Sequence, residues 1–186
     1  TKRFDTICIL DPPPDLDPQT VTDWADGLGV YASFDTVNST YAAIYYPWFT
    51  TFNNINGDSE HTPPSAAAAS ALAQSQWYQA PAGPNRGRLG NNLGLDIKLN
   101  QGDRFFLGQN RINPISDLNG MGYMILGQYI ATLEATILDR IVARTTLMWI
   151  EKAVTTALFT LLVEPNIPRT WNRAISIFQP YLDSLI

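Results

Sequence analysis

The chain has 186 residues, 45% of them apolar, and a net charge of −5. A chain of this length buries roughly 70% of its unfolded surface, so we expect one globular domain. Residues 1–60 hold nine acidic and two basic side chains, whereas residues 61–186 hold eight and ten. Nucleic-acid binding needs several basic groups on one face, and this distribution argues against it. No segment has the apolar length that spans a bilayer, so we expect no membrane insertion and a cytoplasmic setting.

The amino-terminal part predicts a strand, a helix and a second strand. Residues 4–10 are rich in β-formers and stop at Asp11-Pro12-Pro13-Pro14, so we expect a buried strand that contains Cys8, the single cysteine. Asp17 as N-cap and Pro18 at the first position predict a helix to about Leu28, with Val21, Trp24 and Leu28 toward the core. Residues 41–46 are almost all apolar, which is typical of a strand covered on both faces.

The middle of the chain alternates polar loops with short elements. Residues 50–62 predict a surface loop or hairpin tip, and the alanine-rich stretch after Pro63-Pro64 predicts a closely packed helix. Residues 77–90 combine prolines and glycines with almost no catalytic side chains, so we expect an ordered loop that presents a surface. A short helix over 103–110, an extended piece over 113–115 and a strand over 122–126 follow.

Helices dominate the carboxy-terminal part. Apolar periodicity predicts helix over residues 131–163, which Glu164-Pro165 stops. The last helix opens with Asn166 as N-cap and Pro168 in its first turn, and we expect a kink or early stop at Pro180. Its apolar stripe is expected to face the core and consists of Trp171, Ile175, Phe178 and Leu182. The whole pattern predicts an α/β fold, a single domain with a mixed β-sheet packed by helices and two long C-terminal helices.

Candidate catalytic groups are few. His61 is the only histidine and no G-x-S-x-G elbow accompanies it, so we interpret it as a solvated loop residue. One cysteine and one histidine cannot make a zinc site, and we expect no metal and no cofactor. Among the early carboxylates Asp11 is the best candidate for magnesium, because it ends a strand, but caps and turns explain these residues better.

Two glycine patterns resemble nucleotide-binding motifs by letter only. Gly27 to Ala32 matches G-x-G-x-x-A but ends a helix instead of opening one, so a helix C-cap is the better interpretation. The Gly83 to Gly90 loop lacks the G-K-[ST] ending of a phosphate loop.

Seven short motifs, in register along nearly the whole chain, resemble those of the contractile tail sheath proteins of bacteriophages and related injection machines. The most specific is YAAIYYPW at residues 41–48, which is close to the family pattern YAALYYPW. The others are the strand and acid-proline stop of residues 4–13, PPS at 63–65, WYQAPAG at 77–83, NRINPI at 110–115, the helix segments 140–144 and 149–152, and VEPN at 163–166 followed by Trp171. Three positions depart from the family pattern. Arg111 replaces the usual glycine, and Ala69 or Ser70 stands where a glycine is expected after the alanines. The paired arginines of the long helix are reduced to Arg144, which Thr145 follows.

The resemblance implies a structural subunit and not an enzyme. Sheath subunits of this family stack in helical rings around a tail tube, and the sheath shortens and widens to drive the tube through the host envelope for genome ejection. The extended lattice stores the energy, so no nucleotide is consumed. The implied partners are neighbouring sheath subunits and the tail tube protein, and the implied location is the tail sheath of the virion, assembled in the host cytoplasm.

The resemblance also implies a domain organisation. Subunits of the family carry extended arms at both chain ends, which add strands to the sheets of their neighbours. Residues 1–186 correspond to the core domain, so we expect a fragment of a longer protein that lacks both arms and stays monomeric when isolated.

Two other functions stay open at this point. One is an α/β hydrolase or nucleotide-binding enzyme that uses Asp11 and the Gly83 to Gly90 loop. The other is a binding module that only decorates a larger assembly.

Four arginines are the candidate contact residues toward a neighbouring subunit or the tube. Arg86 and Arg88 supply the charge of the proline-glycine loop, and Arg169 and Arg173 lie one helical turn apart, off the apolar stripe. The acidic first third of the chain offers the complementary charge, so such contacts should weaken with salt.

Overall fold

The computed structural model describes residues 5–52, 55, 57–90, 93–118 and 120–183. It confirms the α/β class, a mixed sheet and two long helices in the carboxy-terminal part. Contacts within the chain divide it into two compact units, Thr1–Thr145 and Thr146–Ile186. None of the helices in the described part of the chain combines the length and the apolar character that crossing a bilayer requires.

A four-stranded sheet forms the centre of the first unit. Its strands are β1 (Cys8–Leu10), β2 (Ala42–Tyr46), β6 (Ile112–Asp117) and β7 (Tyr123–Ile125), in the order β1-β2-β6-β7. The first three are parallel and β7 is antiparallel to β6, which makes the sheet mixed. β1 lies at the edge, and Cys8 is therefore exposed, against the expectation of a buried cysteine.

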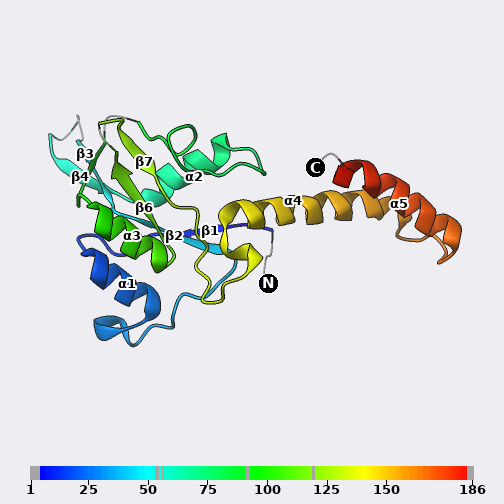
Figure 1. Cartoon of the computed structure of the whole chain (residues 1–186), viewed down its shortest axis with the longest axis horizontal. Helices are drawn as coiled ribbons and strands as arrows, with labels where there is room; N and C mark the ends of the chain where they lie inside the picture. Colours follow the sequence, from blue (N-terminus) through cyan, green and yellow to red (C-terminus); the bar gives the residue numbers. More distant parts are fainter. Residues whose placement is uncertain (1–4, 53–54, 56, 91–92, 119, 184–186) are drawn as a thin grey trace. The chain divides into compact units, whose positions relative to one another are not determined.

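Strand β2 carries the core on both faces, as its apolar sequence predicts. All five of its residues are buried. Ala43 and Tyr45 pack in one apolar cluster with α2 (Pro64–Gln74), and Ala42, Ile44 and Tyr46 pack in the other with α1 (Pro18–Asp26) and α3 (Gln101–Gln109). Figure 1 shows α2 on one side of the sheet and α1 and α3 on the other. This alternation is the period of two that a strand imposes.

A second, smaller sheet has the strand order β4-β3-β5. β3 (Phe49–Phe52) pairs antiparallel with β4 (Ser59–Thr62) and with β5 (Leu93–Leu95). β3 and β4 form a hairpin, so much of residues 50–62 is strand where the sequence predicts a surface loop or hairpin tip. Asn53, Asn54 and Asn56 of the predicted tip lie outside the described residues.

The ends of α1 follow the predicted capping chemistry. The Asp17 carboxylate accepts hydrogen bonds from the backbone N–H groups of Gln19 and Thr20. Gly27 ends the helix with φ of 64°, and a Cβ there would lie 2.5 Å from the carbonyl oxygen of Phe34, so only glycine fits. The chain then turns into the short helix η1 (Gly29–Tyr31). Leu28 therefore follows the helix and is exposed, against its predicted place in the core.

Helix α4 (Ile141–Leu158) begins ten residues later than predicted. Residues before it are extended or in the short helix η2 (Ile137–Asp139), because backbone hydrogen bonds tie them to the core: the N–H of Ala131 donates to the carbonyl of Ala42, and the N–H of Ile141 donates to that of Gln128. Ile130 and Ala131 are buried in this extended conformation. Their apolar character, which suggested helix, reflects burial.

The side chain of Asn113 joins three segments of the first unit. It is fully buried in β6, and its amide donates to the carbonyls of Ile44 and Tyr129, each at 2.9 Å. Its Oδ1 accepts from the N–H of Tyr129 at 2.6 Å. A Cβ on residue 127 would lie 2.8 Å from this Oδ1. The close approach of residues 126–129 to the sheet therefore depends on both Asn113 and Gly127.

The second unit contains the end of α4, the short helix η3 (Phe159–Leu161) and α5 (Pro168–Asp183), which continues past Pro180. The prediction of a core-facing stripe on α5 is wrong for this chain: Trp171 and Ile175 are 55% and 56% exposed. Leu182 is also exposed and Phe178 is half-buried. Among the described residues of this unit, no element covers the apolar side of α5. Asn166 accepts from the indole N–H of Trp171 at 2.6 Å.

Candidate functional site

The proline-glycine loop of residues 77–90 is fastened to strand β7. The N–H groups of Gly83 and Leu89 donate to the carbonyls of Ile125 and Tyr123, and the N–H of Ile125 donates to the carbonyl of Gly87. The Thr145 hydroxyl donates to the carbonyl of Trp77 at 3.0 Å. The loop is ordered, as predicted, and its backbone extends the edge of the sheet.

Gly87 is the tightest point of this loop. A Cβ there would lie 2.8 Å from the Cα of Ala82 and 2.8 Å from the nitrogen of Gly83. Gly90, by contrast, has no atom within 4 Å of such a Cβ. The loop therefore closes on itself at Gly87, and this closure positions the neighbouring arginines.

Arg86 and Arg88 are both exposed, while Leu89 of the same loop is buried. The burial of Leu89 and the hydrogen bonds to β7 fix the backbone of the loop. The two arginine side chains therefore project from an ordered backbone. Both side chains are open to contact, and their role as contact residues stays a prediction.

Arg169 and Arg173 are exposed on α5 in the second unit. Arg173 lies 3.8 Å from the carboxylate of Glu164, and both side chains are largely exposed, so this ion pair contributes little to stability. Both arginines line a hollow within residues 161–176. They belong to a different unit from Arg86 and Arg88, so the two pairs form separate candidate surfaces.

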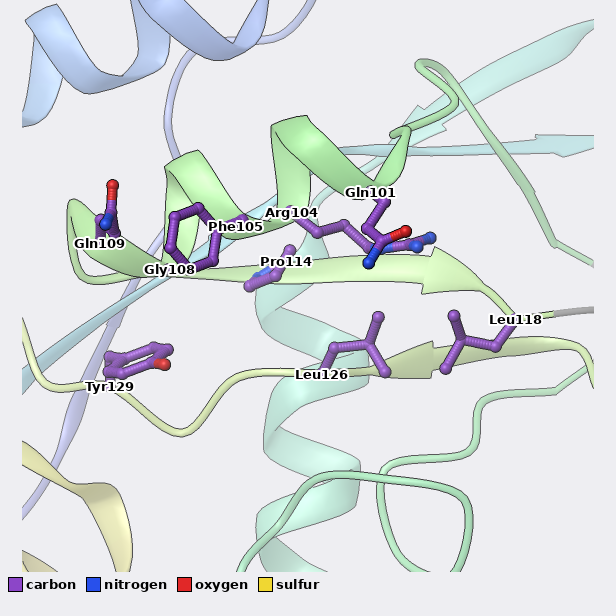
Figure 2. A pocket seen from close by; sticks show the side chains of 9 residues that line it. All are labelled: Gln101, Arg104, Phe105, Gly108, Gln109, Pro114, Leu118, Leu126 and Tyr129. Carbon is purple, nitrogen blue, oxygen red and sulfur yellow. The ribbon is translucent and has the colours of Figure 1, made fainter.

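A shallow groove of about 610 Å³ lies between α3 and the residues after β7 (Figure 2). Phe105 of α3 is exposed in it, and Arg104 is held by a 3.1 Å hydrogen bond from its guanidinium to the hydroxyl of Ser116. The described residues that line the groove include no carboxylate, histidine or cysteine. The groove offers apolar and amide groups, the guanidinium of Arg104 and the phenol of Tyr129 for contact.

The two parts of the enzyme hypothesis do not meet. Asp11 follows β1 and the glycine loop is bonded to β7, and these strands are the opposite edges of the four-stranded sheet. The Asp11 carboxylate accepts from the N–H of Ser65 at 2.8 Å, so it caps the amino-terminal end of α2. Gly27 likewise ends α1, and neither glycine pattern opens a helix of the kind that binds phosphate.

His61 differs from its prediction. It lies in β4, and its Nδ1 is 2.8 Å from Oδ2 of Asp96. This hydrogen bond and the negative charge of Asp96 raise the pKa of His61. The histidine side chain is 48% exposed, whereas that of Asp96 is only 6% exposed.

A third group completes this cluster. Asp15, in the loop between β1 and α1, places a carboxylate oxygen so that ligand atoms of Asp15, His61 and Asp96 all lie within 4.8 Å of one another. Asp96 Oδ1 accepts from the hydroxyl of Thr50, which leaves Oδ2 directed at His61. The cluster was not foreseen because its members are 35 or more positions apart, and only the pairing of β3 with both β4 and β5 brings His61 to Asp96.

No protein-family model matches the chain. In an alignment of 129 positions that covers 67% of its length, it is 33% identical to the tail sheath protein of Enterobacteria phage T4. In an alignment of 153 positions that covers 80% of its length, it is 29% identical to the tail sheath protein of Vibrio phage KVP40. The chain spans 20% and 23% of the length of these two relatives.

A solved structure shares the fold. The sheath complex of an extracellular contractile injection system, PVC, in its contracted state superposes with a TM-score of 0.73. The match has 22% identity and covers 95% of this chain and 47% of that one. The shared fold spans both compact units of the chain.

Proposed function

Because the chain belongs to the family of contractile tail sheath proteins, we propose that it is part of a structural subunit that polymerises into a sheath around a tail tube. Contraction of that sheath drives the tube through the host envelope for genome ejection. The observation that carries the proposal is the 33% identity to a phage tail sheath protein over 129 residues. The relatives are structural proteins, and a catalytic role has no support in this chain.

The proposed partners are neighbouring copies of the sheath subunit and the tail tube protein, without nucleic-acid contact. Exposed apolar side chains favour a role in assembly: Trp171 and Ile175 on α5 are more than half exposed, as is Phe105 on α3. Apolar area of this kind on described elements marks protein contact surfaces. The proposed location is the virion tail, with assembly in the host cytoplasm.

We further propose that residues 1–186 form the core domain of the subunit, with linking arms contributed by other parts of the protein. β1 lies at the edge of the four-stranded sheet, where an arm of another copy can add a strand. Arg86, Arg88, Arg169 and Arg173 are the proposed polar contacts to a neighbour or to the tube.

Deletion of the gene from the producing phage or injection device tests the main proposal. Electron micrographs of the particles should show bare tubes without a sheath, and a plasmid copy should restore it. Particles with an intact sheath would refute the proposal and favour the decorating module.

Charge reversal tests the contact residues. Arg86→Glu with Arg88→Glu, or Arg169→Glu with Arg173→Glu, should impair sheath assembly, and the difference from wild type should shrink at higher salt, because salt screens both the lost attraction and the new repulsion. Lys98→Glu and Lys152→Glu are matched controls on exposed sites of the two units. If the arginine variants assemble as well as these controls, the four arginines are not contacts.

A further inference from the structure

The cluster of Asp15, His61 and Asp96 has the composition of a metal site. One imidazole nitrogen and two carboxylate oxygens come within 4.8 Å of one another. Around a tetrahedral ion with bonds of about 2.1 Å, ligand atoms lie about 3.4 Å apart. His61 and Asp96 are joined by a hydrogen bond of 2.8 Å, so an ion would replace the proton between them and move the two atoms apart to the ligand spacing. The exposed side chains of His61 and Asp15 can rotate to make these adjustments.

The buried member of the cluster is oriented from behind. Asp96 is 6% exposed, and the Thr50 hydroxyl binds its Oδ1, so that Oδ2 is presented to the cluster. Hydrogen bonds of this kind fix the orientation of metal-ligating carboxylates. A carboxylate buried to this degree also needs a positive partner.

The loop that carries Asp15 is fastened on both sides. The Trp48 indole donates to the carbonyl of Pro12 at 2.7 Å, and the Tyr46 hydroxyl donates to that of Leu16 at 2.6 Å. Two carboxylates held this close repel each other unless positive charge lies between them. A protonated His61 balances only one of the two negative charges. A divalent ion balances both and can be coordinated by all three side chains.

We propose that Asp15, His61 and Asp96 bind one divalent transition-metal cation of the zinc class, with water in the remaining position. The imidazole nitrogen favours such an ion over calcium or magnesium, which prefer oxygen ligands alone. The ion would join the loop between β1 and α1 to strand β4 and to the residue after β5. It would thereby connect the three-stranded sheet to the segment that follows edge strand β1 of the four-stranded sheet. This inference is independent of the proposed sheath function.

Titration of the untagged, metal-stripped protein with Zn²⁺ by calorimetry, and with Co²⁺ by visible absorption, tests the proposal. We expect one ion per chain and absorption typical of four- or five-coordinate cobalt. At 100-fold excess over Kd, Zn²⁺ should raise Tm by about 5–10 °C. Asp15→Asn keeps the shape of an exposed side chain, and His61→Gln replaces an exposed imidazole by a neutral amide; each should weaken binding at least tenfold.

Two controls keep the assignment specific. Asp35→Asn removes an exposed carboxylate elsewhere in the first unit and should leave binding unchanged. Cys8→Ser removes the exposed thiol, whose binding to cobalt would reveal itself by a thiolate charge-transfer band. The proposal is overturned by absence of one-to-one binding at millimolar metal, by unchanged affinity in either the Asp15 or the His61 variant, or by loss of binding in Cys8→Ser.

Discussion

Replacement of Asn113 by alanine removes a buried side chain that makes three hydrogen bonds to backbone groups. The variant leaves the carbonyl of Ile44 and both the N–H and the carbonyl of Tyr129 without this partner, in a place that water does not reach because Asn113 is fully buried. An unsatisfied buried polar group costs about 1–3 kcal/mol. Partial relaxation of residues 126–129 lowers the sum, so we expect a loss of about 3–5 kcal/mol in the free energy of unfolding.

Urea unfolding followed by circular dichroism and by tryptophan fluorescence measures this loss. Asn172→Ala, at an exposed position of α5, is the matched control and should change the free energy of unfolding by less than about 0.5 kcal/mol. A loss below about 1 kcal/mol for Asn113→Ala would refute the reasoning, because it would mean that the three backbone groups find other partners.

Three further predictions follow from the caps, the loop and the exposed stripe. Gly87→Ala should destabilise the protein by about 1–3 kcal/mol in thermal unfolding, because its Cβ meets the backbone of Ala82, whereas Gly90→Ala should be nearly neutral. Asp17→Ala should cost about 1 kcal/mol at neutral pH. The hydrogen bond from the Thr20 hydroxyl lowers the pKa of Asp17, so the wild-type advantage is complete above the ordinary aspartate pKa and disappears as the pH falls through the lowered value; an advantage that persists in strong acid would contradict this. Ile175→Asp should leave unfolding within about 0.5 kcal/mol, since this side chain is 56% exposed, but should prevent sheath assembly in electron micrographs; normal sheaths would show that the stripe is no interface.

Local signals in the sequence predict much of the first unit. Asp17 and Gly27 mark both ends of α1 because their conformational preferences are local. The apolar run of β2 predicts its burial on both faces for the same reason. The order and character of most elements therefore follow from short-range chemistry.

Long-range pairing explains what the sequence does not predict. Ile130 and Ala131 are apolar enough for a helix, but hydrogen bonds to distant parts of the chain keep them extended. The contact of His61 with Asp96 likewise depends on two strands that flank β3. On α5, amphipathic periodicity correctly indicates a helix with an apolar side, yet periodicity cannot tell a side that faces the core from one that faces another molecule.

Cryo-electron microscopy of intact particles that carry the full-length gene product, before and after contraction, tests the central claim most directly. We expect a helical sheath around the tube in which every subunit contains the four-stranded sheet of the Thr1–Thr145 unit, with its internal fold unchanged while the lattice shortens and widens. A sheath without this fold, or the fold found only at isolated positions on the particle, would contradict it.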